Sequence, residues 1–189
     1  MREKIKLDQK DRKIITLLYD NKEISQDEIA KKVHLSQPSV AMRIKKLKER
    51  GIVDNIIGVN INKVGIYLAK VMVRTTNTTK ILNMFKGCPF FLNGFVVSGS
   101  DNLMLLFAGE DLASLESIID CRIRPDEDVD SADFNIIISS IKDFIIPIKM
   151  IERPMNTPPC GVEYKECQAY YENRCFGCPA TKLYKGSFW

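Results

Sequence analysis

The sequence predicts an α+β protein in three parts, and three patterns predict it. Residues 1–60 carry apolar positions at helical spacing behind polar helix caps. Residues 69–150 alternate between strand-like and helical segments in the order β-α-β-β-α-β. Residues 151–189 hold four cysteines in a segment with few apolar side chains, and residues 61–68 link the first part to the second.

The composition indicates a globular protein whose first part binds a polyanion. Of 189 residues, 45% are hydrophobic and 28% are charged, and no apolar run is long enough to span a bilayer. No apolar segment follows the first basic residues, so we expect a cytoplasmic protein without a secretory signal or a membrane partner. Residues 1–60 contain 14 Lys and Arg against 9 Asp and Glu, whereas residues 61–150 contain 9 against 11. A basic first third is typical of a domain that binds nucleic acid.

Three helices are expected in the first part, each behind a polar N-cap. The expected caps are Asp8, Ser25 and Ser36. Ser25 forms a capping box with Glu28, and Gly51 supplies the left-handed residue that ends the third helix. A turn of three or four residues joins the last two helices, which is the helix-turn-helix arrangement. Alternation over residues 52–65 predicts a short two-stranded wing.

The outward face of the third helix is basic and predicts contact with double-stranded DNA. Its segment has five basic residues and one acidic residue, Glu49. The candidate DNA-binding residues are Gln37, Ser39, Arg43, Lys45, Lys46 and Arg50. The first three lie near the helix start, where side chains reach base edges. The alternative is a solvated basic face on an ordinary helical bundle, and the capping box and short turn weigh against it.

Landmark residues follow one another in a fixed order over about fifty positions of the first part. They are Leu7-Asp8, Asp11 to Ile14, Ile24-Ser25, Leu35-Ser36, Val40, Arg43, Lys46-Leu47 and Gly51 to Val53. This set resembles the amino-terminal domain of the Lrp/AsnC family of transcriptional regulators. His34 lies where the family usually has a glycine, and we expect it to be a turn residue. The resemblance implies a sequence-specific DNA-binding regulator, not an enzyme, that forms a homodimer or a higher homo-oligomer.

The element order in residues 69–150 is that of a ferredoxin-like domain. The expected elements are a strand at 69–75, a helix at 81–85, two strands around a turn at 99–102, a helix from 111 and a closing strand at 130–144. In the Lrp/AsnC family a domain of this order follows the helix-turn-helix. The resemblance implies that it binds a small-molecule effector and packs the sheets of two chains together.

The hairpin turn of this domain holds the candidate effector-binding residues, which are Gly99, Ser100, Asp101 and Asn102. In the family this turn usually reads Gly-x-x-Asp and lies beside the pocket, often for an amino acid. Here Asn102 takes the acidic position, and an amide cannot offer a full negative charge to an α-ammonium group. The alternative is that Gly99 and Asn102 only favour a hairpin turn and bind no effector.

Four cysteines in the last part are the candidate metal ligands. They are Cys160, Cys167, Cys175 and Cys178, spaced C-x6-C-x7-C-x2-C. A segment this short cannot build a core of its own, whereas a structural metal supplies on the order of 10 kcal/mol. In a reducing compartment, clustered cysteines are more often metal ligands than disulfides. Free thiols or transient disulfides are the alternative.

Two kinds of centre fit this spacing. A [4Fe-4S] cluster takes one thiolate per iron, and a proline directly after a cysteine, as in Cys178-Pro179, is typical of ferredoxin runs. Zn²⁺ usually takes two C-x2-C pairs, and only Cys175 and Cys178 form one. We therefore expect the cluster, with Zn²⁺ as the alternative.

The metal centre is expected to serve as a redox or metal sensor or as a structural brace. The competing functions are a zinc-stabilised regulator that responds to a small-molecule effector, an effector-binding adaptor and an iron–sulfur electron carrier. The sequence has no dinucleotide fingerprint, phosphate loop or catalytic triad, so no enzyme is expected.

Overall fold

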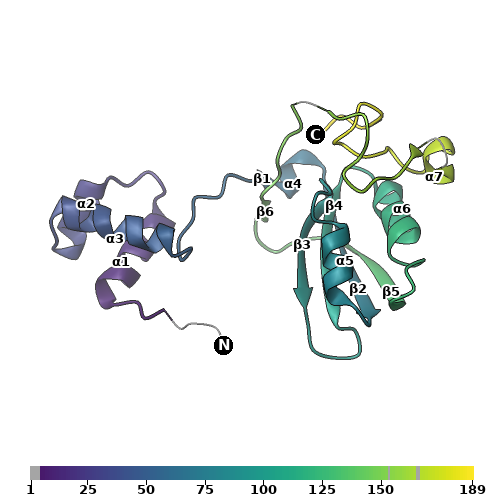
Figure 1. The fold of residues 1–189 in the computed structure, drawn as a ribbon. Coiled ribbons are helices and arrows are strands. Elements are labelled where there is room, and N and C mark those ends of the chain that lie inside the picture. The colour runs from purple at the N-terminus through teal and green to yellow at the C-terminus, as the bar shows by residue number, and fades with distance from the viewer. Residues whose placement is uncertain (1–4, 153, 165–166) are drawn as a thin grey trace. The chain divides into compact units, whose positions relative to one another are not determined.

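The structure is a computed structural model that describes residues 5–152, 154–164 and 167–189. These residues form two compact units, one ending at Ile56 and the other beginning at Ile57. Figure 1 shows the helices of the first unit in purple and blue and the sheet of the second in teal and green. In the described part of the chain, every helix is too short or too polar to cross a membrane.

The first unit consists of three helices that start at the predicted caps. They are α1 (Gln9–Asp20), α2 (Gln26–Val33) and α3 (Gln37–Glu49). The side chains of Asp8, Ser25 and Ser36 each accept a hydrogen bond from the backbone N–H three residues further on. These local bonds satisfy donors that a helix start leaves free, which is why the caps could be predicted from the sequence.

Left-handed residues end the second and third helices, as expected. His34 has φ 54° and Gly51 has φ 64°. Ile14, Ile29 and Val40 are completely buried and bring one residue from each helix into a shared core. The helix-turn-helix arrangement predicted for this part of the chain is therefore confirmed.

The segment after α3 does not form the predicted two-stranded wing. Residues 52–58 contain no strand, β1 (Val59–Asn60) pairs with β6 (Ile145–Ile146), and α4 (Ile61–Val64) follows. The hairpin prediction is wrong because alternation indicates a strand without specifying its partner. Ile146 is 2% exposed and packs against Ile61, so the distant strand offers burial that a local hairpin lacks.

The second unit contains a four-stranded antiparallel sheet with two helices on one face (Figure 1). Its elements are β2 (Tyr67–Thr75), α5 (Thr78–Met84), β3 (Phe91–Val96), β4 (Leu103–Gly109), α6 (Leu112–Arg122) and β5 (Val129–Ile137). The spatial order β3-β4-β2-β5 makes the fold ferredoxin-like, as predicted. Val71, Leu105 and Phe107 are buried between the sheet and the helices.

The opposite face of the sheet is mixed in character: Ile61 of α4 packs with Leu68 and Ala108 at one end, and the rest carries apolar residues beside charged ones. One row of residues crosses the four strands through Phe95, Met104, Met72 and Asp133. These residues alternate with the buried Val71 and Leu105, so they lie on the other face. Phe95 is 40% exposed. The exposed apolar residues at this end of the face are suited to contact with a second protein surface.

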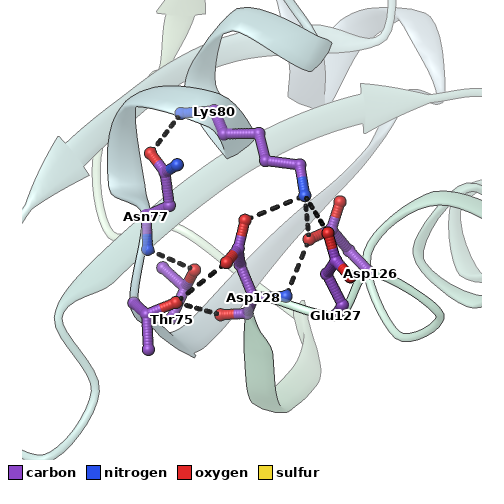
Figure 2. A network of polar contacts seen from close by, with 7 residues as sticks. Thr75, Asn77, Lys80, Asp126, Glu127 and Asp128 are labelled. Carbon is purple, nitrogen blue, oxygen red and sulfur yellow. Dashed lines mark hydrogen bonds and ion pairs between the residues drawn. The ribbon is translucent and has the colours of Figure 1, made fainter.

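A charged network ties the first turn of α5 to the loop before β5 (Figure 2). Lys80 Nζ lies 2.9 Å from an Asp126 carboxylate oxygen, 2.8 Å from one of Asp128 and 3.9 Å from one of Glu127. Asn77 caps the helix by accepting a hydrogen bond from the Lys80 N–H at 3.0 Å. The hydrogen bond from Lys80, with a second from Thr76, lowers the pKa of Asp128 below its ordinary value of 3.8.

Replacing Lys80 with methionine is expected to flatten the acid end of the stability profile. A carboxylate with a lowered pKa stabilises the fold above pH 3.8, and this contribution is lost as the pH falls through its folded-state pKa. Lys80→Met removes the main cause of the shift, so its free energy of unfolding should fall less between pH 4 and pH 2 than that of the unaltered chain. Urea unfolding at several pH values measures this. Lys86→Met, on an exposed side chain two residues after α5, is the control and should keep the unaltered slope.

The last part of the chain packs on the second unit. Met155 donates a backbone hydrogen bond to Ala180 at 2.7 Å, and the short helix α7 (Gln168–Tyr171) follows. The Trp189 ring lies edge-on to Phe90 with 5.3 Å between ring centroids. Glu110, just after β4, accepts hydrogen bonds from the Tyr184 hydroxyl and from the Ser187 N–H. These contacts with the rest of the second unit also stabilise the last part of the chain, which we expected from the sequence to depend on a metal alone.

Candidate functional site

The exposed side of α3 carries most of the predicted DNA-binding residues. Val40, Ile44 and Leu47 turn inward and fix the orientation of the helix. Gln37, Lys45, Lys46 and Arg50 are exposed, and Ser39 and Arg43 are half-buried. The Gln37 side chain donates to Gln26 of α2 at 2.9 Å, and Lys45 lies 3.8 Å from Glu49 on the helix surface.

Arg43 is engaged inside the first unit. Its guanidinium donates at 2.7 Å to Asp8, the cap of α1, and at 2.7 Å to Asp11 in the first turn of that helix. Hydrogen bonds from the Asp11 N–H and from Arg43 lower the pKa of Asp8. Arg43 therefore joins α3 to the start of α1, and its predicted contact with DNA stays a prediction.

The stripe of α3 that contains Arg43 faces a groove beside α1. Ser39, Lys46 and Arg50 lie four to eleven residues apart on this stripe, and Asp8 and Asp11 lie on the opposite wall. The two carboxylates make the groove less basic than the outer side of the helix. Lys46 and Arg50 line this groove but keep exposed side chains, and Lys45 lies outside it.

The turn predicted to bind an effector is closed onto a neighbouring strand. The Asn102 side-chain amide donates to the Thr75 carbonyl at 2.7 Å and accepts from the Thr75 N–H at 3.0 Å. Arg74 donates to the Ser100 carbonyl at 3.0 Å, and Gly99 has φ 126°. Asn102 thus extends the pairing of β2 beyond the end of the hairpin, a structural use of the residue that differs from the family pattern. The effector role of residues 99–102 stays a prediction.

All six cysteines of the chain line one cavity in the second unit. Four are the predicted ligands of the last part, Cys160, Cys167, Cys175 and Cys178, and the other two are Cys88 and Cys121. We call it the cysteine cavity. It has a volume of about 80 Å³, well above the roughly 10–15 Å³ that one water molecule needs, and its lining is almost entirely carbon and sulfur.

One stripe of α6 forms the floor of the cysteine cavity and holds the last part of the chain. Ser114 is 1% exposed, and its hydroxyl accepts a hydrogen bond from the Phe176 N–H at 2.7 Å. The Ser117 hydroxyl donates to the Arg174 carbonyl at 3.3 Å. Ser114, Ser117 and Cys121 are three and four residues apart, so they lie on one face of the helix. Hydrogen bonds on both sides of Cys175 therefore fix this cysteine over that face.

The C-x2-C pair forms a compact turn in which one backbone donor points at sulfur and a second points at the Tyr164 hydroxyl. Gly177, at φ 83°, donates its N–H to Cys175 Sγ at 3.4 Å. The Cys178 N–H donates to the Tyr164 hydroxyl at 2.6 Å. Both cysteines are buried, with exposed fractions of 9% for Cys175 and 7% for Cys178. Short turns in which backbone N–H groups point at sulfur are suited to thiolate ligands.

Burial favours the protonated form of the Cys88, Cys175 and Cys178 thiols. It raises the pKa of Cys88 to about 12 and that of Cys178 to about 11. Burial also raises the pKa of Cys175, and hydrogen bonds from the Gly177 N–H and the Ser114 hydroxyl partly oppose it. A metal ion would have to displace these protons to bind.

The residues of the cysteine cavity match the donor set of a thiolate metal centre, although they are not pre-arranged as ligands. Within residues 5–152, 154–164 and 167–189, no three Cys, His, Asp or Glu side chains lie close enough together to hold a metal ion. The sulfurs would need to turn inward. Arg122 also lines the cavity, and its buried Nε has no hydrogen-bond partner in this part of the structure. An unpaired buried donor beside six sulfurs fits an anionic thiolate centre.

Sequence reasoning missed Cys88 and Cys121, and it missed the engagement of Arg43. Cys88 and Cys121 lie far from the four clustered cysteines in the sequence, so spacing gave no sign of them. The one available signal was that the chain contains six cysteines and none in its first 87 residues.

Known proteins resemble this chain in both sequence and fold. The family model for winged helix-turn-helix DNA-binding matches residues 7–54. The leucine-responsive regulatory protein of Rhizobium meliloti is 27% identical over 147 residues, which cover 74% of this chain and 94% of that protein. The HTH-type transcriptional regulator LrpA of Pyrococcus horikoshii is 27% identical over 140 residues, covering 72% and 99%.

Solved structures agree with these sequence matches. The structure of LrpC from B. subtilis superimposes with a TM-score of 0.60 at 25% identity, covering 73% of this chain and 99% of that one. The relatives thus match over nearly their whole length, whereas about a quarter of this chain has no counterpart in them. The chain is therefore similar in sequence and in fold to transcriptional regulators of the Lrp/AsnC type, and its residues 7–54 match winged helix-turn-helix DNA-binding domains.

Proposed function

We propose that this chain is a DNA-binding transcriptional regulator of the Lrp/AsnC type, that it holds a metal centre in the cysteine cavity and that the centre controls its binding to DNA. The observation that carries the proposal is the convergence of Cys160, Cys167, Cys175 and Cys178, predicted as ligands from their spacing, on one apolar cavity. Thiolates are the preferred ligands of iron–sulfur clusters and of structural zinc.

A [4Fe-4S] cluster is the proposed centre, with Zn²⁺ as the alternative outcome. A bound cluster would supply ligation energy to the last part of the chain and iron that responds to oxidants. The chain's own residues would exclude water through the apolar lining and donate hydrogen bonds to sulfur from Gly177 and Ser114. Hydrogen bonds to sulfur and exclusion of solvent are the means by which a protein tunes such a centre.

DNA recognition is proposed to use the exposed side of α3, with Gln37 near base edges and Lys45, Lys46 and Arg50 on phosphates. Ser39 lies near the same end of the helix, on the groove side. A helix-turn-helix protein commonly binds as a dimer, whose geometry sets the spacing of the two half-sites. We propose a homodimer that covers the open sheet face around Phe95 and Met72.

Through the proposed dimer, the metal centre could change the affinity of the protein for DNA. The last part of the chain packs on α6 and beside β4, in the same unit as the open sheet face. A change in how it docks would change the surface that pairs two chains, and with it the spacing of their DNA-binding units.

Removing the metal is expected to change operator affinity at least tenfold. The test is purification without oxygen, followed by metal analysis, a visible absorption spectrum and DNA binding before and after treatment with a chelator. About four irons per chain and a brown colour would support the cluster, and one or more zinc ions in a colourless protein would support the alternative. Equal affinity with and without metal would reduce the centre to a structural brace. A chain that carries neither metal would overturn the proposal.

A further inference from the structure

We infer that the metal centre takes sulfur from the body of the fold as well as from its last part, with Cys88 and Cys121 as ligands in addition to the four clustered cysteines. This rests on the zinc alternative of the proposed metal centre, because a [4Fe-4S] cluster takes only four thiolates. It adds two ligands that the spacing of the cysteines did not indicate. A centre built in this way ties the last part of the chain to α6 and to the turn before β3.

The position of Cys121 follows from the docking of the last part on α6. Ser114 and Ser117 bind the backbone on either side of Cys175, as described above. Cys121 lies one turn further along the same face of the helix and at the rim of the cavity, where its side chain is exposed. The thiols of Cys121 and Cys175 therefore lie on the same wall of the cavity.

The position of Cys88 follows from a close backbone approach on the other side of the cavity. Pro159 packs directly on Gly87, where an added Cβ would lie 2.9 Å from the Pro159 Cβ. The residues that follow these two are Cys88 and Cys160. Cys88 lies in the tight turn that ends α5, with its N–H donating to the Phe85 carbonyl at 2.9 Å, so its place in the cavity wall is fixed by the fold.

The charge of the cavity favours an anionic centre with many thiolates. Each thiolate bound to a metal adds a negative charge. Arg122 lies one residue after Cys121, and its buried Nε has no hydrogen-bond partner among the residues that the structure describes. A metal-bound sulfur beside Arg122 would accept a hydrogen bond from its Nε–H. An occupied cavity would therefore give this buried donor the partner that it lacks.

Six sulfurs exceed the four that one tetrahedral ion or one [4Fe-4S] cluster takes. Two four-coordinate ions that share two sulfurs take six thiolates, as in the Zn₂Cys₆ modules of DNA-binding proteins. With Zn²⁺ as the probe metal, we therefore expect two ions per chain. This ligand count can be measured whichever metal the protein holds when it is isolated.

The test is a titration of the reduced, metal-free full chain with Zn²⁺, read by metal content after gel filtration and by competition with a chelator. We expect two ions per chain, falling to one in Cys88→Ser and in Cys121→Ser, with at least a tenfold loss of affinity for the ion that is lost. Co²⁺ serves as a second probe because its absorption reports thiolate ligation directly. Cys121 is exposed, so its replacement leaves the core intact even if Cys88→Ser impairs folding.

Ile118→Val is the matched control, because Ile118 lines the same wall and offers no ligand. It should bind two ions with the affinity of the unaltered chain. A single Zn²⁺ per chain, bound equally well by both serine variants, would overturn the inference and leave the four-cysteine centre standing. A chain that binds no Zn²⁺ and is isolated without iron would instead remove the proposed centre itself.

Discussion

Replacing Lys45, Lys46 and Arg50 with alanine should weaken DNA binding by about 10²–10³-fold at 0.1 M salt. Each phosphate contact releases about 0.9 counterion, so three contacts contribute about 2.7 logarithmic units at this salt concentration. The logarithmic dependence of affinity on salt should fall by about three. All three side chains are exposed, and alanine is a good helix former, so α3 should remain folded.

A matched control separates the face of α3 from the overall charge. Arg12→Ala, Lys13→Ala and Lys22→Ala remove the same number of positive charges from exposed positions on α1 and the turn after it. This control should keep its affinity within a few-fold and its salt dependence nearly unchanged. Fluorescence anisotropy with labelled operator DNA at several salt concentrations measures both quantities. If the two triple variants lose the same affinity and salt dependence, α3 contributes no more to DNA binding than α1 does.

Arg43 is left out of this variant because it also holds the fold together. Its loss would leave two carboxylates of α1 without their partner, and Asp11 has only 17% of its side chain exposed. A drop in DNA binding would then reflect a damaged domain as readily as a lost contact. The three exposed residues give a cleaner test.

The double replacement Cys175→Ser and Cys178→Ser should abolish metal binding and release the last part of the chain. These residues form the one C-x2-C pair, and both are buried in the cysteine cavity. A structural metal site contributes about 10–16 kcal/mol of binding free energy, so losing two ligands leaves almost no metal bound. We expect residues 151–189 to become sensitive to protease while the sheet and its two helices stay resistant.

Metal content and limited proteolysis measure the outcome. Met155→Leu is the control, since it removes a sulfur from the same segment at a position that is 48% exposed and outside the cavity wall. It should keep its metal and its resistance. Full protease resistance in the serine variant would show that contacts such as those of Glu110 and Trp189 are enough to hold the segment without a metal.

The sequence was most informative where the interactions are local. The capping boxes at Asp8 and Ser25 involve residues three apart, and the left-handed turns at His34 and Gly51 need only one residue each. The β-α-β-β-α-β order could be read for the same reason, because each element has its own periodicity. The closing strand was predicted to run to residue 144 and ends at Ile137, since strand-like composition continues beyond the last paired residue.

Long-range pairings could not be predicted from the sequence. Val59 and Asn60 pair with a strand near residue 145, Arg43 binds carboxylates more than thirty residues away, and Asn102 bonds to the backbone of Thr75. Each depends on how the elements pack, which local patterns do not specify. The cysteine cavity illustrates both cases. Four of its thiols could be predicted because they cluster in the sequence, whereas Cys88 and Cys121 could not, because only the fold brings them there.

The gathering of every thiol at one place gives the chain a built-in chemical reporter. Residues 1–87 contain no cysteine, so a maleimide dye leaves the DNA-binding unit unlabelled and modifies only the cavity wall. The rate of dye attachment then measures how open that wall is, and nothing else in the molecule contributes to the signal. To follow α3 itself by fluorescence, a new thiol must be engineered into the first unit after the native six are blocked or replaced.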